Sequence, residues 1–250
     1  NREELEPAIT EDTQLISVML ANNEIGVIQP LPEIAALCRA HGVTLHSDAA
    51  QAFGQIPLDT KLVGADLLSL SAHKLNGPKG IGALICNPDT ALEPIVWGGG
   101  QEQGIRPGTL PVPLIMGFAK AAELALKGLD SRSERLGALR NRLWEGLRQK
   151  HSTLLLNGSA TARLPHNLNI TVPGVSGNKL HRALRSRVSC SSGSACSRGE
   201  PSHVLMALGR SHQEAEASLR LSLGHSTTDK EIDQAIDAIS EVIHKLRHKA

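Results

Sequence analysis

The chain has 250 residues, of which 40% are hydrophobic and 20% charged, and its formal net charge is +1. This composition is ordinary for one or two globular domains. The balanced charge gives no reason to expect nucleic acid or a membrane surface as a partner. No apolar run approaches the ~18–20 residues of a membrane span, and the first residues do not resemble a signal peptide.

Four cysteines are spread along the chain, at Cys38, Cys86, Cys190 and Cys196. They are too few for a disulfide scaffold, and no C-x-x-C pair indicates zinc. We therefore expect no metal site and a reducing, cytoplasmic environment.

Strand-like and helix-like segments alternate in the first half of the chain. Apolar runs predict strands at residues 14–21, 43–48, 65–71 and 80–86. Between the first two, Pro32 and Gly42 mark the start and end of a helix. Nearly continuous apolar strands with helices between them predict an α/β fold whose sheet is covered on both faces.

The pattern changes after about residue 128. Residues 131–150 predict a long amphipathic helix, with leucines at helical spacing. Two strands and three helices are then expected, at residues 166–172, 178–186, 201–209, 217–223 and 229–249. This mixture predicts a smaller α+β domain, so we divide the chain into residues 1–128 and 129–250.

A carboxylate and an amine follow two neighbouring strands of the predicted sheet. Asp48 ends one strand, and Lys74 lies just beyond the next, in the stretch SLSAHKLNGPKG. Ligands of open α/β sheets bind outside the carboxyl ends of the strands. The two residues could form an ion pair, or they could hold pyridoxal phosphate, with the lysine bonded to the cofactor and the aspartate facing its pyridinium nitrogen. Taken alone, each is more often a solvated lysine or a helix cap.

The surrounding residues favour a cofactor site. Residues 22–26 (NNEIG) place polar amides at what we expect to be a third strand end. Gln51 follows Asp48, Ser71 and His73 flank Lys74, and the glycines of GPKG allow the backbone to pass close to a ligand.

Several motifs, in a consistent order, extend over most of the sequence: NNEIGVIQP, HSDAAQAFGQIPLD, SLSAHKLNGPKGIGAL, GGGQEQGIRPGT, SCSSGSACS, EPSHVLMALG and SLRLSLGHSTTDKEID. With these motifs the chain resembles the cysteine desulfurases of the NifS/IscS class. The resemblance implies the aspartate-aminotransferase fold of pyridoxal-phosphate enzymes, with a mainly parallel sheet in the large domain.

The resemblance also implies the cofactor site. Lys74 would hold pyridoxal phosphate through its amine, and Asp48 would pair with the pyridine nitrogen. The other cofactor-binding positions would be Asn23, Gln51, Ser71, His73 and Thr109. The last of these would reach the phosphate in the other subunit of a homodimer.

For the substrate, the resemblance implies that Arg220 clamps the α-carboxylate with help from Asn23, and that Cys196 takes the sulfur. A bidentate guanidinium suits a carboxylate better than a lysine does. The small residues from Ser191 to Ser197 predict a mobile loop that carries the Cys196 thiol. We assign no role to the other three cysteines.

The implied reaction converts L-cysteine to L-alanine and leaves a persulfide on Cys196. The sulfur would go to an acceptor or iron–sulfur scaffold protein, for iron–sulfur clusters and other sulfur cofactors. Three alternatives stay open: a selenocysteine or cystine lyase; a non-catalytic fragment that serves as a dimerisation or scaffold module; and a generic α/β protein with a redox cysteine. The third alternative does not explain why Asp48, Lys74 and Arg220 occur together.

The sequence also departs from the family pattern. Family members carry, before the part that matches Asn1, a glycine–threonine phosphate loop and a histidine that stacks on the cofactor ring. Neither is present in this sequence. We expect the missing part to be a separate or removed segment, and the chain alone to have little activity.

Overall fold

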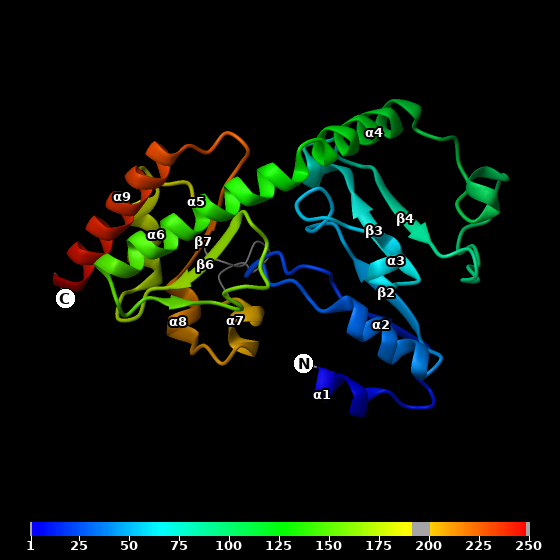
Figure 1. The fold of residues 1–250 in the computed structure, drawn as a ribbon, viewed down its shortest axis with the longest axis horizontal. Helices are drawn as coiled ribbons and strands as arrows, with labels where there is room; N and C mark the ends of the chain where they lie inside the picture. The colour runs from blue at the N-terminus through cyan, green and yellow to red at the C-terminus, as the bar shows by residue number, and fades with distance from the viewer. Residues whose placement is uncertain (1, 192–200, 249–250) are drawn as a thin grey trace. The chain divides into compact units, whose positions relative to one another are not determined.

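The computed structural model describes residues 2–191 and 201–248, and Figure 1 shows its ribbon. The chain forms two compact units. The first contains Asn1–Leu20 and Gln29–Leu129, and the second contains Ala21–Ile28 and Asp130–Ala250. The short segment Ala21–Ile28 therefore belongs to a unit whose other residues come much later in the chain.

The first unit is built on a four-stranded sheet with the order β1-β2-β3-β4. The strands are β1 (Leu15–Ser17), β2 (Thr44–Asp48), β3 (Leu67–Ser71) and β4 (Gly82–Cys86). The first three run parallel, and β4 is antiparallel to β3. β1 is shorter than the predicted run of residues 14–21 because the chain enters the second unit at Ala21.

The prediction that both faces of the sheet are covered is wrong for β4, which is exposed along its whole length. The connection from Ala72 to Ile81 is shorter than the crossover of about a dozen residues that a parallel pair needs. β4 therefore returns antiparallel at the sheet edge, and only the single turn of 3-10 helix at Ala72–Leu75 lies between it and β3. β2 and β3 alternate between buried and half-buried residues, so they present one packed face and one more open face.

Short helices and one long helix complete the first unit. They are α1 (Arg2–Leu5), η1 (Glu6–Ala8), α2 (Leu31–Ala40), α3 (Thr60–Val63), η2 (Ala72–Leu75), η3 (Gln101–Gly104) and α4 (Val112–Leu126). α2 buries Ile34, Leu37 and Cys38 on one face and packs against β2. Pro32 in its first turn needs no backbone hydrogen bond, which explains why the helix begins there.

The second unit has an antiparallel sheet with the order β5-β6-β7. Its strands are β5 (Leu155–Leu156), β6 (Asn167–Thr171) and β7 (Ser218–Ser222), and its helices are α5 (Leu129–Lys150), α6 (Gly177–Leu184), α7 (His203–Ala207), α8 (His212–Glu216) and α9 (Asp229–His248). No helix among the described residues is long and apolar enough to cross a membrane.

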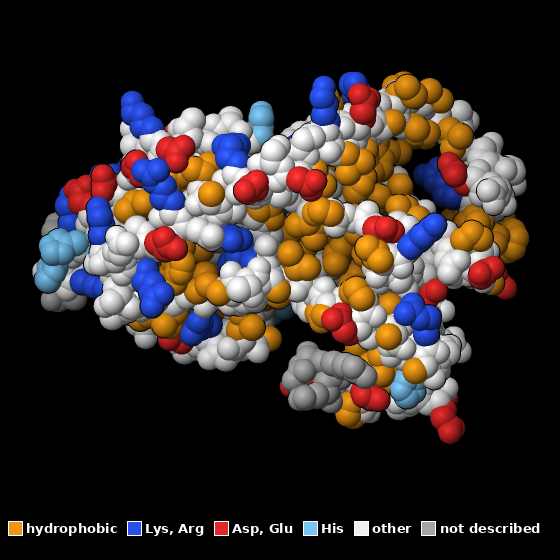
Figure 2. Space-filling view, in the orientation of Figure 1, with side chains coloured by type: hydrophobic (Ala, Val, Ile, Leu, Met, Phe, Trp, Pro, Cys, Tyr) orange, Lys and Arg blue, Asp and Glu red, His pale blue; other side chains and the backbone are white. Residues whose placement is uncertain are grey.

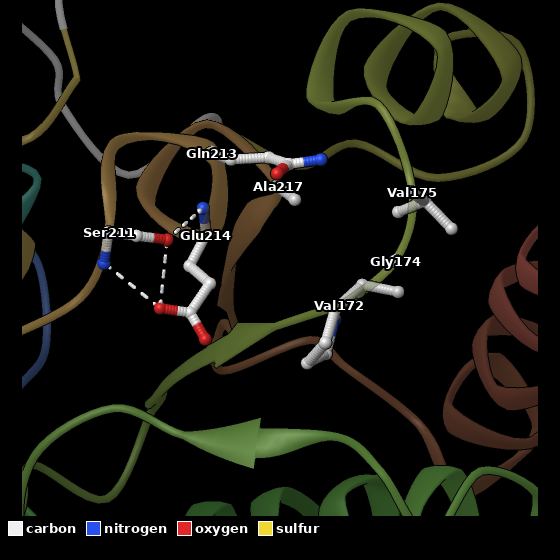
Figure 3. A pocket seen from close by; sticks show the side chains of 8 residues that line it. Val172, Gly174, Val175, Ser211, Gln213, Glu214 and Ala217 are labelled. Atoms are coloured by element: carbon white, nitrogen blue, oxygen red, sulfur yellow. Dashed lines mark hydrogen bonds between the residues drawn. The ribbon is translucent and has the colours of Figure 1, made fainter.

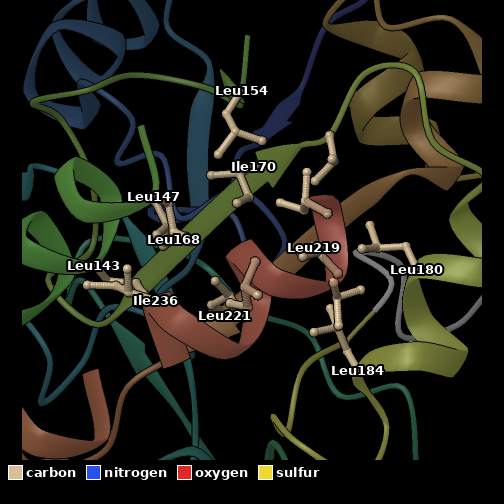
Figure 4. Close-up of a cluster of buried hydrophobic side chains, with 14 of the residues drawn as sticks. Leu143, Leu147, Leu154, Leu168, Ile170, Leu180, Leu184, Leu219, Leu221 and Ile236 are labelled. Atoms are coloured by element: carbon tan, nitrogen blue, oxygen red, sulfur yellow. The ribbon is translucent and has the colours of Figure 1, made fainter. Parts of the chain in front are cut away.

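Leucine and isoleucine side chains form the core of the second unit, as Figure 4 shows. Leu143 and Leu147 come from α5, Leu168 and Ile170 from β6, and Leu219 from β7. Leu147, Ile170 and Leu219 are completely buried. Burying one such side chain contributes about 1.5–3 kcal/mol. This core therefore fixes β6 and β7, and β7 carries the predicted site residue Arg220.

Large hydrophobic side chains remain exposed in the first unit. Ile95 is 95% exposed, Trp97 82% and Met116 63%. Figure 2 shows hydrophobic side chains gathered over α4 and the segment after β4. An exposed apolar surface of this kind marks an interaction surface in soluble proteins.

Replacing Leu219 with alanine is expected to lower the free energy of unfolding by about 2–5 kcal/mol, because the side chain is fully buried and the cavity would not close. The matched control is Leu208→Ala, since Leu208 is 47% exposed; it should change the free energy by no more than about 0.5 kcal/mol. Urea unfolding of the two variants measures the difference. Equal effects would contradict the core described above.

Candidate active site

Asp48 stands at the carboxyl end of β2, the last residue of that strand. It pairs with Ser69 of β3, so the two side chains lie on the same face of the sheet. Its carboxylate Oδ1 accepts a hydrogen bond of 2.8 Å from the N–H of Ala50, which fixes the side chain at the start of the following turn. Asp48 is otherwise exposed, so the carboxylate is accessible to a ligand.

A row of polar side chains crosses the same face of the sheet. His46 Nδ1 lies 2.7 Å from Ser17 Oγ, and His46 Nε2 lies 3.1 Å from Ser69 Oγ. One imidazole thereby links β1, β2 and β3, and its tautomer decides which hydroxyl donates. We did not predict this row, since each member is an ordinary polar residue of an alternating strand. It keeps polar the face on which Asp48 stands.

Lys74 lies in η2, the tight turn that directly follows β3. The turn ends at Asn76, whose φ of 62° is left-handed, a conformation that asparagine tolerates better than most residues. The N–H of Gly77 donates to the C=O of Ala72 at 3.0 Å. A Cβ on Gly77 would lie 2.9 Å from that oxygen, so the turn requires glycine. The backbone below Lys74 is thus fixed, while the amine itself is exposed.

Small residues of α4 support this turn. Ala121 packs so close to Gly77 that a Cβ on the glycine would lie 3.0 Å from the alanine Cβ. Gly117, one helical turn earlier, faces Pro78 at a comparable separation, 3.0 Å from its Cβ position to the proline ring. Larger side chains at these α4 positions would push the helix away from the segment that holds Lys74.

The remaining predicted residues of the first unit lie at different places. Ser71 Oγ and His73 Nδ1 are 2.8 Å apart beside Lys74, so a hydroxyl and an imidazole stand together after β3. Gln51 is half-buried in the turn that follows β2. Thr109 is exposed, between η3 and α4.

Asn23 lies in the second unit, on a tight turn. Asn22 Oδ1 accepts hydrogen bonds from the N–H groups of Glu24 at 2.8 Å and of Ile25 at 3.0 Å. This bonding closes the turn and leaves Asn23 exposed at its outer side. Gly26 has φ 72°, and a Cβ there would lie 2.7 Å from Asn167, so glycine is required. Residues 22–26 follow the segment that pairs with β2, where the N–H of Leu20 donates to the C=O of Asp48 at 2.8 Å, and by their contacts they belong to the second unit.

Arg220 of β7 contacts the same turn. Its Nη1 donates a hydrogen bond of 3.2 Å to the C=O of Asn23, and its side chain is half-buried. The structure therefore brings together Asn23 and Arg220, the two residues that the resemblance assigned to the substrate. This contact leaves the guanidinium Nε and Nη2 without a hydrogen-bond partner among the described residues.

A groove with a volume of about 800 Å³ lies beside Arg220. Its lining includes His181, Arg185 and Cys190. A second pocket of about 320 Å³, shown in Figure 3, lies between α8 and the end of β6. There the Glu214 carboxylate accepts hydrogen bonds from Ser211 in a helix cap, so its charge is already used in the fold. The groove beside Arg220 is thus the better substrate candidate of the two.

The predicted nucleophile, Cys196, and the part of its predicted loop after Ser191 lie outside the described residues. Of the other thiols, Cys38 is buried and Cys190 is half-buried, and burial raises the pKa of both. A raised pKa keeps a thiol protonated and therefore weakly nucleophilic. Cys86 ends β4 and is exposed.

A buried arginine stiffens the loop that holds the Asn23 turn. Arg163 is 5% exposed, and burial, with a smaller effect of Arg140, lowers its pKa to about 10. Its guanidinium donates to the C=O groups of Asn157 and Ser159 within the same loop. From that loop, the N–H of Leu164 donates to the C=O of Gly26 at 2.8 Å. The turn that carries Asn23 is therefore bonded to a loop whose conformation is held by the hydrogen bonds of Arg163.

Comparison with known proteins supplies the family. The sequence profile described as "Aminotransferase class-V" matches residues 1–235. The chain belongs to the class-V aminotransferase family. This class-V aminotransferase chain is 49% identical to "Cysteine desulfurase, mitochondrial" of Eremothecium gossypii, over 98% of the chain and 50% of that protein. It is 44% identical to "Cysteine desulfurase IscS" of Rickettsia africae, over 98% of the chain and 60% of that protein.

Solved structures agree with this placement. A "NifS-like protein" superposes with a TM-score of 0.87 at 33% identity, covering 98% of the chain and 65% of that structure. "SspA in complex with cysteine" superposes with a TM-score of 0.73 at 33% identity, covering 91% and 64%. The predicted α/β fold and the resemblance to the NifS/IscS class are confirmed. The chain spans only about half to three fifths of the length of these curated relatives.

The stability of this class-V aminotransferase chain should depend on the protonation of His166. Burial, with a smaller effect of Arg140, lowers the pKa of His166 to about 4, whereas an unfolded histidine titrates near ~6.5. The unfolded chain therefore binds a proton first. The contribution of His166 to the free energy of unfolding is at its full value above about pH 6.5. It falls by up to about 3 kcal/mol as the pH drops towards about 4.

Urea unfolding at several pH values tests this dependence. His166→Gln should reduce the loss of stability between about pH 6.5 and about pH 4, while the exposed control His212→Gln should keep the wild-type slope. If both variants keep that slope, His166 does not stay neutral in the folded protein.

Proposed function

We propose that this chain is part of a pyridoxal-phosphate-dependent cysteine desulfurase that releases alanine from L-cysteine. The observation that carries the proposal is the fixed turn that places Lys74 directly after β3. β3 pairs with β2, the strand that ends in Asp48. The identity of 44–49% to proteins named cysteine desulfurase supports the choice of reaction.

The residues at the carboxyl ends of β2 and β3 fit the cofactor in their chemistry. Lys74 offers an exposed amine to hold it, and Asp48 offers an accessible carboxylate for a pyridinium nitrogen. Ser71 and His73 would bind the phosphate, and Gln51 with Asn23 the phenolic oxygen. When bound, pyridoxal phosphate supplies an electron sink for the carbanion at the substrate α-carbon. Lys74 Nζ is the base that would take the α-proton and return it.

Arg220 would bind the α-carboxylate of the substrate, together with Asn23. The bond from Arg220 Nη1 to the Asn23 C=O orients the guanidinium, and its Nε and Nη2 have no partner in the described part of the chain, which supports their use for a carboxylate. This arrangement supports an amino acid as substrate over an amine without a carboxylate.

Sulfur transfer would fall to Cys196. Its thiolate attacks the substrate sulfur, the substrate Cβ–S bond breaks, and a new S–S bond forms. The departing carbon takes a proton and becomes the methyl group of alanine. L-cysteine and a protein thiol thereby give L-alanine and a protein persulfide, with no external oxidant. The persulfide would pass to an acceptor or iron–sulfur scaffold protein.

A homodimer belongs to the same proposal. Thr109 would reach the phosphate in the second copy, and it is exposed beside Leu110 and Val112, which are 39% and 59% exposed. An exposed apolar surface beside it supports a partner chain there. The cytoplasmic location stays a prediction.

Borohydride reduction of the cofactor-loaded protein is expected to fix pyridoxal phosphate on Lys74, because the turn after β3 fixes the backbone that carries this exposed amine. Peptide mapping by mass spectrometry locates the label. Lys74→Arg, which keeps the charge but cannot form the bond, should abolish labelling, while Lys79→Arg should leave it unchanged. A label on Lys79 or another lysine would refute the assignment.

Cys196→Ser is expected to stop alanine production from L-cysteine and to leave the cofactor spectrum unchanged, since only sulfur transfer uses the thiol. Cys190→Ser is the matched control and should retain most of the activity. Alanine release is measured by chromatography. Turnover in the Cys196 variant close to the wild-type rate would show that another group accepts the sulfur.

A further inference from the structure

A buried carboxylate lies next to Asn23 in the sequence. Glu24 is 4% exposed, and its Oε2 accepts a short hydrogen bond from the hydroxyl of Ser202. Ser202 is 2% exposed and caps α7, because its Oγ also accepts from the N–H of Leu205 at 3.2 Å. No ion pair reaches Glu24 within the described part of the chain. A buried carboxylate without a cation is costly, so its hydrogen bond has to be maintained.

The backbone of Glu24 is held from a second side. Its C=O accepts from Asn169 Nδ2 at 3.0 Å and from Asn167 Nδ2 at 3.3 Å. Asn169 is the residue of β6 that pairs with Arg220 of β7. The sheet that carries Arg220 and the cap of α7 therefore meet at Glu24.

The adjoining peptide unit orients Arg220. Arg220 Nη1 donates to the C=O of Asn23, which belongs to the peptide bond between Asn23 and Glu24. Any rotation of that peptide would move the acceptor and with it the guanidinium. Two-point recognition of a carboxylate tolerates only about 0.5 Å and 10–20° of misplacement.

We propose that Glu24 is a positioning residue that, through Ser202 and the Asn23 peptide, sets Arg220 for the α-carboxylate of an amino-acid substrate. The inference rests on the proposed function, since it takes Arg220 as the group that binds the carboxylate. Glu24 acts as a hydrogen-bond acceptor here, and its charge is not required. Glutamine should therefore replace it, and alanine should not.

The test compares two ligands in the cofactor-loaded protein by titration calorimetry: L-alanine, and ethylamine, which is the same amine without the carboxylate. Wild type should prefer L-alanine. Glu24→Ala and Ser202→Ala should weaken L-alanine binding about tenfold or more, as expected for a lost hydrogen bond to a charged group, and leave ethylamine unchanged. Glu24→Gln should stay within about twofold of wild type, because its amide oxygen still accepts from Ser202. Glu145→Ala, at an exposed carboxylate of α5, is the control.

The outcomes separate this inference from the function on which it rests. If wild type prefers L-alanine and both alanine variants keep that preference, Glu24 does not position Arg220 and the proposed function stands. Equal weakening of both ligands would also overturn the inference, since general loosening of the fold is not specific for a carboxylate. If wild type itself shows no preference for L-alanine, the role of Arg220 is wrong and the inference falls with it.

Discussion

The turn at Asn22–Gly26 must satisfy its buried backbone groups away from water, and the site in the second unit depends on how it does so. A buried C=O or N–H without a partner costs as much as a lost hydrogen bond. The C=O of Glu24 accepts a hydrogen bond from the side-chain amide of Asn169, and the C=O of Gly26 accepts one from the N–H of Leu164. With these bonds made, the C=O of Asn23 has one fixed direction, and Arg220 takes its orientation from it.

Much of the fold could be predicted from apolar periodicity, because the spacing of apolar residues is a local signal that marks the buried face of each helix or strand. The strand predicted at residues 65–71 appears as β3, and the helix at residues 131–150 as α5. The exposure of β4 was not predicted, because a run of apolar residues does not show whether other elements cover the strand. The contacts of the turn at residues 22–26 with Asn169 and Arg220 could not be predicted, because these partners lie far along the chain.

The candidate site could be predicted where a residue's chemistry is unusual for its position. A lysine and an aspartate at the ends of adjacent apolar strands stand out, whereas Arg220 was assigned only through the resemblance to a family. The row of Ser17, His46 and Ser69 gives no such signal, because it exists only through the strand register. Glu24 looks like a surface glutamate in the sequence, and only its burial reveals a role.

The membership of Ala21–Ile28 in the second unit has a consequence for the order of folding during synthesis. The ribosome makes this turn well before its partners, since Asn169 follows Glu24 by 145 positions and Arg220 follows Asn23 by 197. Closing such long loops carries an entropy cost, and contacts of this range form slowly. The turn therefore has to wait for the C-terminal half to emerge. A fragment that starts at Asp130 would contain every strand of the second sheet. It would lack the segment Ala21–Ile28, whose Asn23 C=O accepts the hydrogen bond from Arg220.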